Sequence, residues 1–140
     1  MTGLAKIESA WEGLRLHLLS LVRIMSALLL LQHATQKFLA FPSPSPWGPV
    51  PLGSLNGAAG ALELVGGILL LVGLFTRLAA FVLSGTMAAA YFIAHSSHGF
   101  FPIDNGGELA VLYCFAFLYL SSAGPGKWAL DWHVRNAERP

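Results

Sequence analysis

Cysteine and charge are both scarce in this chain of 140 residues. Cys114 is the one cysteine, which excludes an intrachain disulfide framework. Charged residues make up 11% of the sequence, against about 25% in soluble proteins, and the formal net charge is +1. Because Lys and Arg are scattered rather than clustered, we expect no nucleic-acid partner.

Sequence motifs of common catalysts are missing as well. The chain has no Cys-x-x-Cys pair, no Gly-x-Ser-x-Gly nucleophile motif, no P-loop and no dinucleotide-binding fingerprint. We interpret the lone thiol of Cys114 as a small apolar side chain rather than a redox group. A covalent catalyst or a nucleotide site is therefore not expected.

Apolar residues dominate instead, at 55% of the chain, with a mean hydropathy of +0.63. Four mostly apolar segments are bounded by polar residues or by Gly and Pro, at about residues 14–39, 55–75, 78–95 and 108–122. A helix of about 20 residues crosses the hydrocarbon core, so the last two segments need flanking residues to span it. The sequence predicts one all-α domain, residues 1–140, that forms a transmembrane four-helix bundle in a lipid bilayer. A short interfacial tail is expected at 125–136.

Basic residues predict the orientation of these helices. The linkers 40–54 and 96–107 contain no Lys or Arg, whereas six basic residues lie on the other side: Lys6, Arg15, Arg77, Lys127, Arg135 and Arg139. By the positive-inside rule, both termini are cytoplasmic and the two linkers face outward. The first linker is rich in proline and cannot be helical, so we expect an extracytoplasmic loop over the bundle mouth. Trp47 is expected to anchor that loop at the headgroups.

Ionisable side chains within the apolar segments are the most informative feature, because each costs about 2.5–3.5 kcal/mol to insert into a membrane. At 100° per residue, Arg23, His33 and Lys37 fall on one face of the first helix. At 1.5 Å per residue, Glu63 lies about 12 Å into the second helix, at a depth similar to that of Lys37. An unpaired carboxylate in hydrocarbon would neutralise, so we expect Glu63 to pair with Lys37 or His33. The outer ends of the other two helices complete a predicted outer-half polar pocket of His33, Lys37, Glu63, His95 and Glu108.

Two other interpretations of these residues stay open. The ionic groups can serve only to fix the register in which the helices pack. His33, with His95 or His98, can in principle ligate haem or a metal, because imidazole suits both. The chain has no recognised metal-ligand spacing, however, so we expect no metal site and no haem.

The order of several residues resembles the DoxX family of small four-helix membrane proteins. The resemblance covers about residues 18–131. Its elements are, in order, Arg23, Lys37, the run Glu63-Leu-Val-Gly-Gly-Ile-Leu-Leu-Leu-Val-Gly-Leu-Phe-Thr-Arg77, then Asn105-Gly-Gly-Glu108-Leu-Ala, and finally Gly124-Pro-Gly-Lys-Trp-Ala-Leu-Asp131.

This resemblance implies a multi-pass protein of a prokaryotic cytoplasmic membrane. It also implies a subunit of a membrane oxidoreductase system, since family relatives are associated with thiosulfate:quinone oxidoreductase. The positions that match the family's polar motif are Arg23, Lys37, Glu63, Arg77, Asn105 and Glu108. We interpret Arg23, Arg77 and Asn105 as structural.

Two functions from different classes follow. In the first, the chain positions a quinone headgroup in the outer-half pocket, with Lys37 or His33 donating to a quinone oxygen and Glu63 or Glu108 relaying a proton. In the second, it is a non-catalytic scaffold or accessory subunit that binds another membrane protein, or a second copy of itself. A small-solute transporter is a third and less favoured function, because four helices leave little room for a gated pathway.

Overall fold

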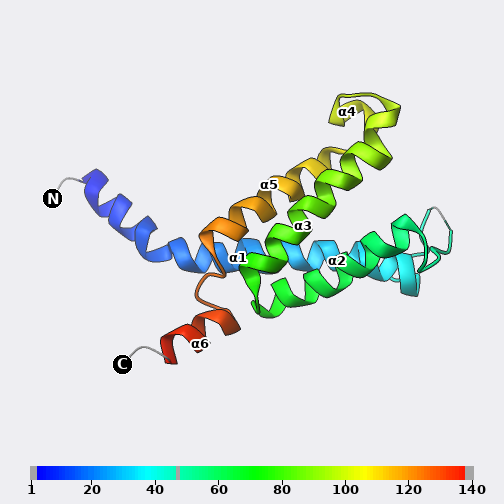
Figure 1. Cartoon of the computed structure of the whole chain (residues 1–140). Coiled ribbons are helices and arrows are strands. Elements are labelled where there is room, and N and C mark those ends of the chain that lie inside the picture. Colours follow the sequence, from blue (N-terminus) through cyan, green and yellow to red (C-terminus); the bar gives the residue numbers. More distant parts are fainter. Residues whose placement is uncertain (1–2, 47, 138–140) are drawn as a thin grey trace.

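The computed structural model describes residues 3–46 and 48–137, and all regular structure within them is helical (Figure 1). The all-α class is therefore confirmed. Trp47, the expected headgroup anchor, lies outside the described residues. The helices in chain order are α1 (Gly3–Leu39), α2 (Leu55–Val72), α3 (Thr76–Ala90), the π-helical turn η1 (Tyr91–His95), the 3-10 turn η2 (Ser96–His98), α4 (Pro102–Asn105), α5 (Glu108–Ala123) and α6 (Leu130–Ala137).

Three helical segments are long and apolar enough to cross a membrane: Gly3–Leu39, Leu55–Val72 and Thr76–His98. A fourth, α5, is apolar but has only 16 residues. The chain is accordingly a multi-pass membrane protein. Its orientation, its treatment as one domain and the side on which the Pro-rich loop lies remain predictions from the sequence.

Three helix boundaries differ from those expected from the apolar segments. Helix α1 already includes Gly3 and so starts well before the expected residue 14, because its first turns mix good helix formers such as Ala, Leu, Lys and Glu without a proline, although they are less continuously apolar than the rest. Helix α2 ends at Val72, three residues early, because Gly73 adopts φ 71° and closes the helix. The tail folds only from Leu130, as α6.

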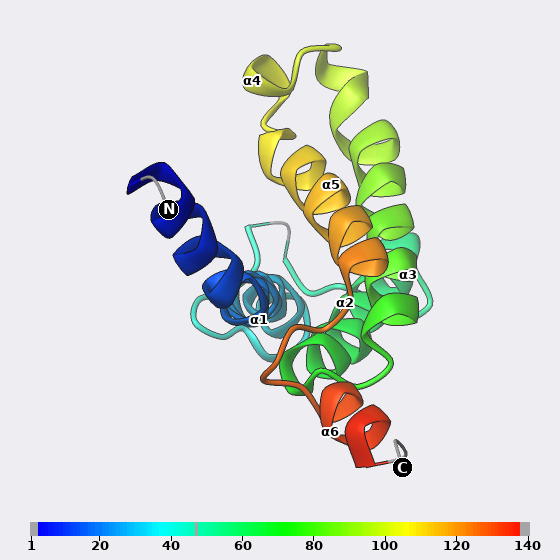
Figure 2. The same ribbon diagram turned by 90° about the vertical axis from the view of Figure 1, so that its left-hand side faces the viewer.

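The four long helices pack as two antiparallel hairpins, α1 with α2 and α3 with α5 (Figure 1). Helices α2 and α3 also pack on each other beyond the short turn that joins them, whereas α1 and α5 touch at few residues. Both ribbon views show the far ends of the two hairpins apart, with α4 well away from the loop between α1 and α2 (Figure 2). The loops at the far ends of the two hairpins therefore do not meet around a common opening of the bundle.

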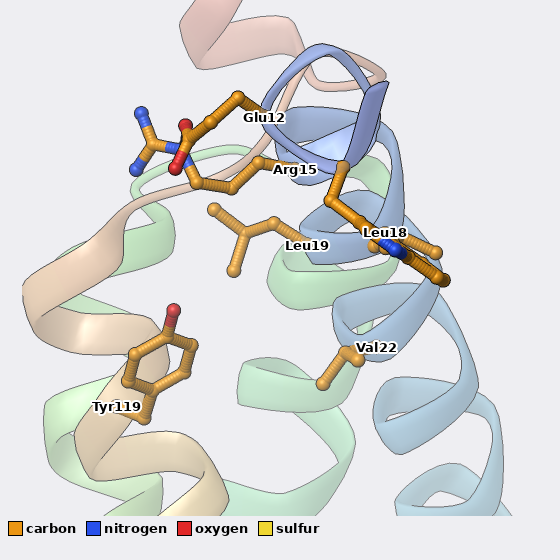
Figure 3. A pocket seen from close by; sticks show the side chains of 7 residues that line it. Glu12, Arg15, Leu18, Leu19, Val22 and Tyr119 are labelled. Carbon is orange, nitrogen blue, oxygen red and sulfur yellow. Dashed lines mark ion pairs between the residues drawn. The ribbon is translucent and has the colours of Figure 1, made fainter. Parts of the chain in front are cut away.

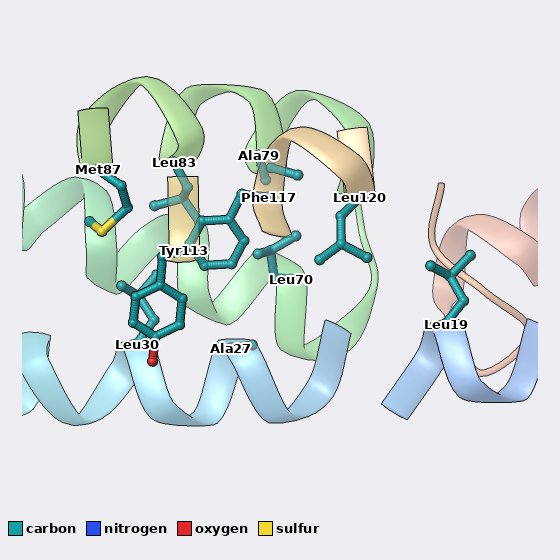
Figure 4. Close-up of a cluster of buried hydrophobic side chains, with 11 residues drawn as sticks. Leu19, Ala27, Leu30, Leu70, Ala79, Leu83, Met87, Tyr113, Phe117 and Leu120 are labelled. Atoms are coloured by element: carbon teal, nitrogen blue, oxygen red, sulfur yellow. The ribbon is translucent and has the colours of Figure 1, made fainter. Parts of the chain in front are cut away.

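The core lies where the two hairpins cross (Figure 4). Each long helix contributes at least one side chain that is almost fully buried: Leu30 from α1, Leu70 from α2, Leu83 from α3 and Phe117 from α5. Burial of such a side chain contributes about 1.5–3 kcal/mol relative to exposure in water, but lipid removes most of that difference. Close packing rather than water exclusion must therefore hold the hairpins together.

Two adjacent glycines of α2 allow this close packing. A Cβ atom at Gly66 would lie 2.8 Å from Leu83 Cγ of α3, and one at Gly67 would lie 2.8 Å from Leu31 Cδ2 of α1. Real Cβ atoms do not approach so closely, so a larger residue at either position would displace a neighbouring leucine. Helix α2 is thus the element that joins the two hairpins.

Candidate functional site

A buried ion pair links α1 to α2. The Lys37 Nζ atom donates to both Glu63 oxygens, at 2.9 Å and 2.7 Å, and the exposed side-chain fractions are 24% for Lys37 and 6% for Glu63. Gly60, one turn before Glu63, makes room for this lysine, because a Cβ there would lie 3.1 Å from Lys37 Cδ. The pairing expected from the sequence is therefore present.

His33 lies one turn before Lys37 and contacts α5 rather than Glu63. Its ring makes an edge contact with Tyr113, with 6.4 Å between ring centroids. Its Nδ1 atom lies 3.1 Å from the Leu29 carbonyl oxygen. Because a carbonyl oxygen only accepts hydrogen bonds, this contact assigns a proton to Nδ1.

The Tyr113 hydroxyl is buried without a hydrogen-bond partner. Three buried side-chain polar atoms lack a partner within residues 3–46 and 48–137: His17 Nδ1, Thr76 Oγ1 and Tyr113 Oη. The tyrosine reaches from α5 toward α1, with its hydroxyl beside the α1 ribbon (Figure 4). His33 and Lys37 are neighbours on α1 because they are four residues apart, and each contacts one residue of another helix. We call His33, Lys37, Glu63 and Tyr113 the ion-pair cluster.

A second polar group, the tip network, closes the far end of the α3–α5 hairpin. His95 Nδ1 lies 3.1 Å from the Asn105 carbonyl oxygen, and the His95 ring stacks on Tyr91. The Asn105 Nδ2 atom donates to the Gly99 carbonyl at 2.6 Å and to the Tyr91 hydroxyl at 3.3 Å. Tyr91 and His95, both on the π-helical turn η1, and Asn105 of α4 therefore use these polar groups to hold the turn between α3 and α5 in place.

The five residues expected to line one pocket are therefore divided. Lys37 and Glu63 are paired, His33 adjoins them along α1, and His95 belongs to the tip network. Glu108 is exposed at the start of α5 and makes no ion pair within the described residues. Equal depth does not imply proximity here, because the hairpins diverge toward the ends that carry these groups.

Arg23 is fully buried where the hairpins meet, and backbone carbonyls surround its guanidinium group. It donates to Pro125 O at 2.8 Å, to Leu71 O at 2.9 Å, and to Leu70 O and Trp128 O. The Leu70 and Leu71 carbonyls belong to the last turn of α2, where the helix dipole is negative, and Leu70 O also accepts the Gly73 N–H at 3.2 Å. Arg23 thus fastens both α2 and the C-terminal loop to α1.

Arg77 and Asp131 complete this end of the molecule. Arg77 donates to the carbonyls of Ser121, at 3.0 Å, and Ser122 at the end of α5. The Asp131 carboxylate accepts the backbone N–H groups of Phe75, at 2.9 Å, and Thr76, at 2.8 Å, and so caps the start of α3. We call Arg23, Arg77 and Asp131 the arginine junction.

The sequence did not indicate the positions that Tyr113 and Asp131 take in the structure, although Asp131 ends the last run that resembles the DoxX family. Tyr113 is one aromatic residue in the apolar run of α5, and nothing in its immediate neighbours distinguishes it. Asp131 is separated from α3 by more than fifty residues, so no local capping pattern reveals it. Residues 3–46 and 48–137 hold no group of three or more His, Cys, Asp or Glu side chains arranged to bind a metal ion.

A model of the DoxX family matches residues 18–96. The chain belongs to the DoxX family. The matched part of this DoxX protein includes Arg23, His33, Lys37 and Glu63, and it stops before α5, which supplies Tyr113.

Its relatives are bacterial proteins. The DoxX protein is 48% identical over 124 residues to an uncharacterized protein of Haemophilus influenzae, which covers 86% of this chain and 92% of the relative. A second uncharacterized protein of the same bacterium is 32% identical over 88 residues, 63% of this chain and 58% of that relative. No solved structure matches.

Proposed function

We propose that this DoxX protein is a membrane subunit of an oxidoreductase system and that it binds a quinone headgroup at the ion-pair cluster. The observation that carries the proposal is Tyr113, which is 5% exposed and whose hydroxyl has no hydrogen-bond partner in the described structure. A buried, unpaired hydroxyl costs about 1–3 kcal/mol, and a ligand oxygen that accepts a hydrogen bond from it removes that cost. Quinone carbonyl oxygens are such acceptors and reach the site through lipid.

His33 supplies the complementary acceptor. The Nδ1 atom is directed at the Leu29 carbonyl, and in the tautomer that carries its proton there, Nε2 can accept a hydrogen bond from a hydroxyl. Tyr113 and His33 together can therefore hydrogen-bond both the carbonyl of a quinone and the hydroxyl of a quinol. A quinone supplies the transfer of two electrons and two protons, and the electrons pass to or from a partner subunit of the system.

In this proposal Lys37 does not donate to the quinone oxygen, a role that the sequence analysis gave to Lys37 or His33. Lys37 directs its ammonium group at both oxygens of Glu63, so Tyr113 and His33 replace it as the groups that contact the headgroup. The pair lies one turn from His33 and its lysine side chain is 24% exposed, so it is the charged group that adjoins His33 along α1. Glu108 lies at the other hairpin's tip and takes no part.

The test is quinone content. The protein is purified in mild detergent from bacterial membranes, lipids are extracted, and quinone per protein is measured by mass spectrometry for the wild type, Tyr113→Phe, His33→Ala and Tyr119→Phe. We expect bound quinone in the wild type, a loss of at least about threefold in the first two variants, and no change in the third. Tyr119 is the matched control, because it lies on the same helix and is 59% exposed.

Two outcomes contradict the proposal. One is a wild-type protein with no more quinone than an unrelated membrane protein purified in parallel. The other is a Tyr113→Phe protein that keeps the wild-type quinone content while remaining folded by size-exclusion chromatography.

An accessory subunit is the second candidate function, and an apolar groove favours it. The groove lies between α2 and α3, has a volume of about 210 Å³, and includes Leu62, Val65, Leu69, Leu78 and Val82 in its lining. Side chains of another membrane protein could fill it. A stoichiometric protein partner that is lost on Val65→Trp, together with no bound quinone, would support this function in place of the first.

We place the protein in the cytoplasmic membrane with both termini inside, on the distribution of Lys and Arg described above. Reporter fusions test this orientation. A periplasm-dependent phosphatase should be inactive when fused after the C-terminus and active when inserted in residues 40–54. The reverse pattern would place the ion-pair cluster in the cytoplasmic half.

A further inference from the structure

Helix α1 bends where the C-terminal loop meets it (Figure 1). The Leu16 carbonyl accepts a hydrogen bond from Ser20 Oγ at 3.0 Å and a second from the Lys127 N–H at 3.2 Å. The Trp128 N–H in turn donates to Ser20 Oγ at 3.0 Å. Hydroxyl and loop donors that enter the helical hydrogen-bond ladder bend a helix, and these do so at one point.

This bend leaves a groove between α1 and the end of α5. The groove has a volume of about 350 Å³, and its lining includes Leu18, Leu19 and Val22 of α1 and Tyr119 of α5 (Figure 3). Ligand sites have volumes of about 300–1,000 Å³, so this groove is of a size for a slender ligand. A helix of about 10–12 Å diameter, from a second copy or another protein, would not enter it.

The position of the groove along the membrane normal is given by its aromatic residues. Trp11 and Tyr119 belong to its lining, come from different helices and are 60% and 59% exposed. Trp and Tyr gather at the headgroup level of membranes. The path from Trp11 to Val22 along the bent axis of α1 is about 17 Å, so its depth along the membrane normal is at most about that of one leaflet's hydrocarbon, ~15 Å. The groove thus runs from the headgroups into a single leaflet.

A cation and an anion lie together at the polar end of the groove. Arg15 Nε and Glu12 Oε2 are 3.5 Å apart, and their side chains are 68% and 76% exposed (Figure 3). An exposed pair of this kind is weak, so both groups are available to other charges. A zwitterionic headgroup, with a phosphate and an ammonium a few atoms apart, has the complementary pair of charges.

We infer that this groove binds one phospholipid with a primary-ammonium headgroup, such as phosphatidylethanolamine. Arg15 donates to the phosphate, Glu12 accepts from the ammonium, and one acyl chain lies along Leu18, Leu19 and Val22. A choline headgroup has no N–H donor, so it attracts the Glu12 carboxylate by charge alone and cannot donate a hydrogen bond to it. The site lies near the opposite end of α1 from the ion-pair cluster, so it stands or falls independently of quinone binding.

Native mass spectrometry of the detergent-purified protein tests the inference. Phosphatidylethanolamine, phosphatidylcholine and phosphatidylglycerol are added separately at equal concentration, and the retained lipid is quantified. We expect the wild type to retain phosphatidylethanolamine about threefold better than phosphatidylcholine, as expected for one exposed ion pair. Glu12→Gln should remove that preference, and Arg15→Gln should weaken retention of both lipids by about threefold.

Matched variants keep the test independent of folding. Val22→Trp fills the groove from a residue that is 47% exposed and should abolish retention without disturbing the core. Arg135→Gln removes an exposed charge of α6 and should change nothing. Equal retention of the ethanolamine and choline lipids, preferential retention of phosphatidylglycerol, or wild-type retention by Arg15→Gln would each overturn the assignment.

Discussion

The arginine junction and the ion-pair cluster both bury charge from α1, yet they treat their polar groups in opposite ways. Arg23 is fully buried and directs its guanidinium N–H groups at the backbone carbonyls of four residues. In the ion-pair cluster, the hydroxyl of Tyr113 is buried with no partner in the described residues. A polar group whose bonding is complete supports architecture, whereas one left incomplete is the place to look for a ligand.

Arginine suits the first task because of its shape. Its planar fork presents five donors in fixed directions, which lets one side chain bond the end of α2 and the loop 125–128 together. A lysine in the same place would offer three donors around a single point. The comparison therefore predicts large effects on folding at the junction, and small ones at Tyr113.

Arg23→Met gives the largest expected effect. It leaves the carbonyls of Pro125, Leu71 and Trp128 without this donor, whereas Leu70 O keeps the Gly73 N–H. Each buried unpaired group costs about 1–3 kcal/mol, so the stability loss should exceed about 3 kcal/mol. Arg23→Lys should recover only part of it. The measurement is the thermal unfolding midpoint in detergent by fluorescence-detected size exclusion, with Arg135→Met as the exposed control. A midpoint for Arg23→Met near that of the wild type would mean that the junction does not hold the hairpins together.

Separating the ion pair comes next. Lys37→Met leaves the Glu63 carboxylate buried without its cation, a change that costs about 3–5 kcal/mol in buried pairs. The double variant Lys37→Met/Glu63→Gln should be more stable than Lys37→Met alone, because it removes the unpaired charge. The unfolding midpoints of the wild type, Lys37→Met, Glu63→Gln and the double variant are the four corners of a double-mutant cycle. Additive losses in that cycle would show that the two side chains do not interact.

Removing the cap of α3 should have a moderate effect. Asp131→Ala deprives the Phe75 and Thr76 N–H groups of their acceptor and should cost about 1–2 kcal/mol. Asp104→Ala, at an exposed site on α4, serves as the control and should change stability by less than about 0.5 kcal/mol. Hydrogen exchange at the start of α3 should rise in the first variant alone. Unchanged hydrogen exchange at the start of α3 would show that Asp131 does not cap this helix.

Tyr113→Phe should affect stability least. Its hydroxyl has no partner to lose in the described structure, so the unfolding midpoint should stay at or slightly above the wild-type value. A marked fall in the midpoint would show that the hydroxyl is bonded within the protein itself, and the contrast with Arg23 would fail. The same variant is expected to lose quinone, which separates a binding role from a structural one.

The sequence predicted those parts of the structure that depend on one helix or on two adjacent ones. The helical class, the apolar spans, the family and the Lys37–Glu63 contact all follow from local patterns and from the cost of an unpaired charge in lipid. The lateral separation of the hairpins did not follow, because depth places Lys37 and His95 on a common level without fixing the distance between them. The depth of an ionisable side chain in the membrane therefore predicts its partner only when the neighbouring helix is known.

Long-range contacts were equally hidden. Asp131 caps a helix that begins fifty-five residues earlier, and Ser20 bonds the backbone of Trp128 across the chain. Tyr113 differs from the other aromatic residues of α5 only in what surrounds it after folding. Such positions are defined by tertiary packing, which no periodicity or cap motif in the sequence encodes.

Quinone affinity in a bilayer tests the central claim most directly. Wild-type protein and Tyr113→Phe, each reconstituted in lipid nanodiscs, are titrated with a short-chain quinone, and binding is followed by the quenching of tryptophan fluorescence. We predict saturable binding by the wild type and a dissociation constant about fivefold higher for Tyr113→Phe, equal to about 1 kcal/mol for one net hydrogen bond. Equal dissociation constants, or no saturable binding by the wild type, would contradict the claim that the buried hydroxyl of Tyr113 awaits a ligand.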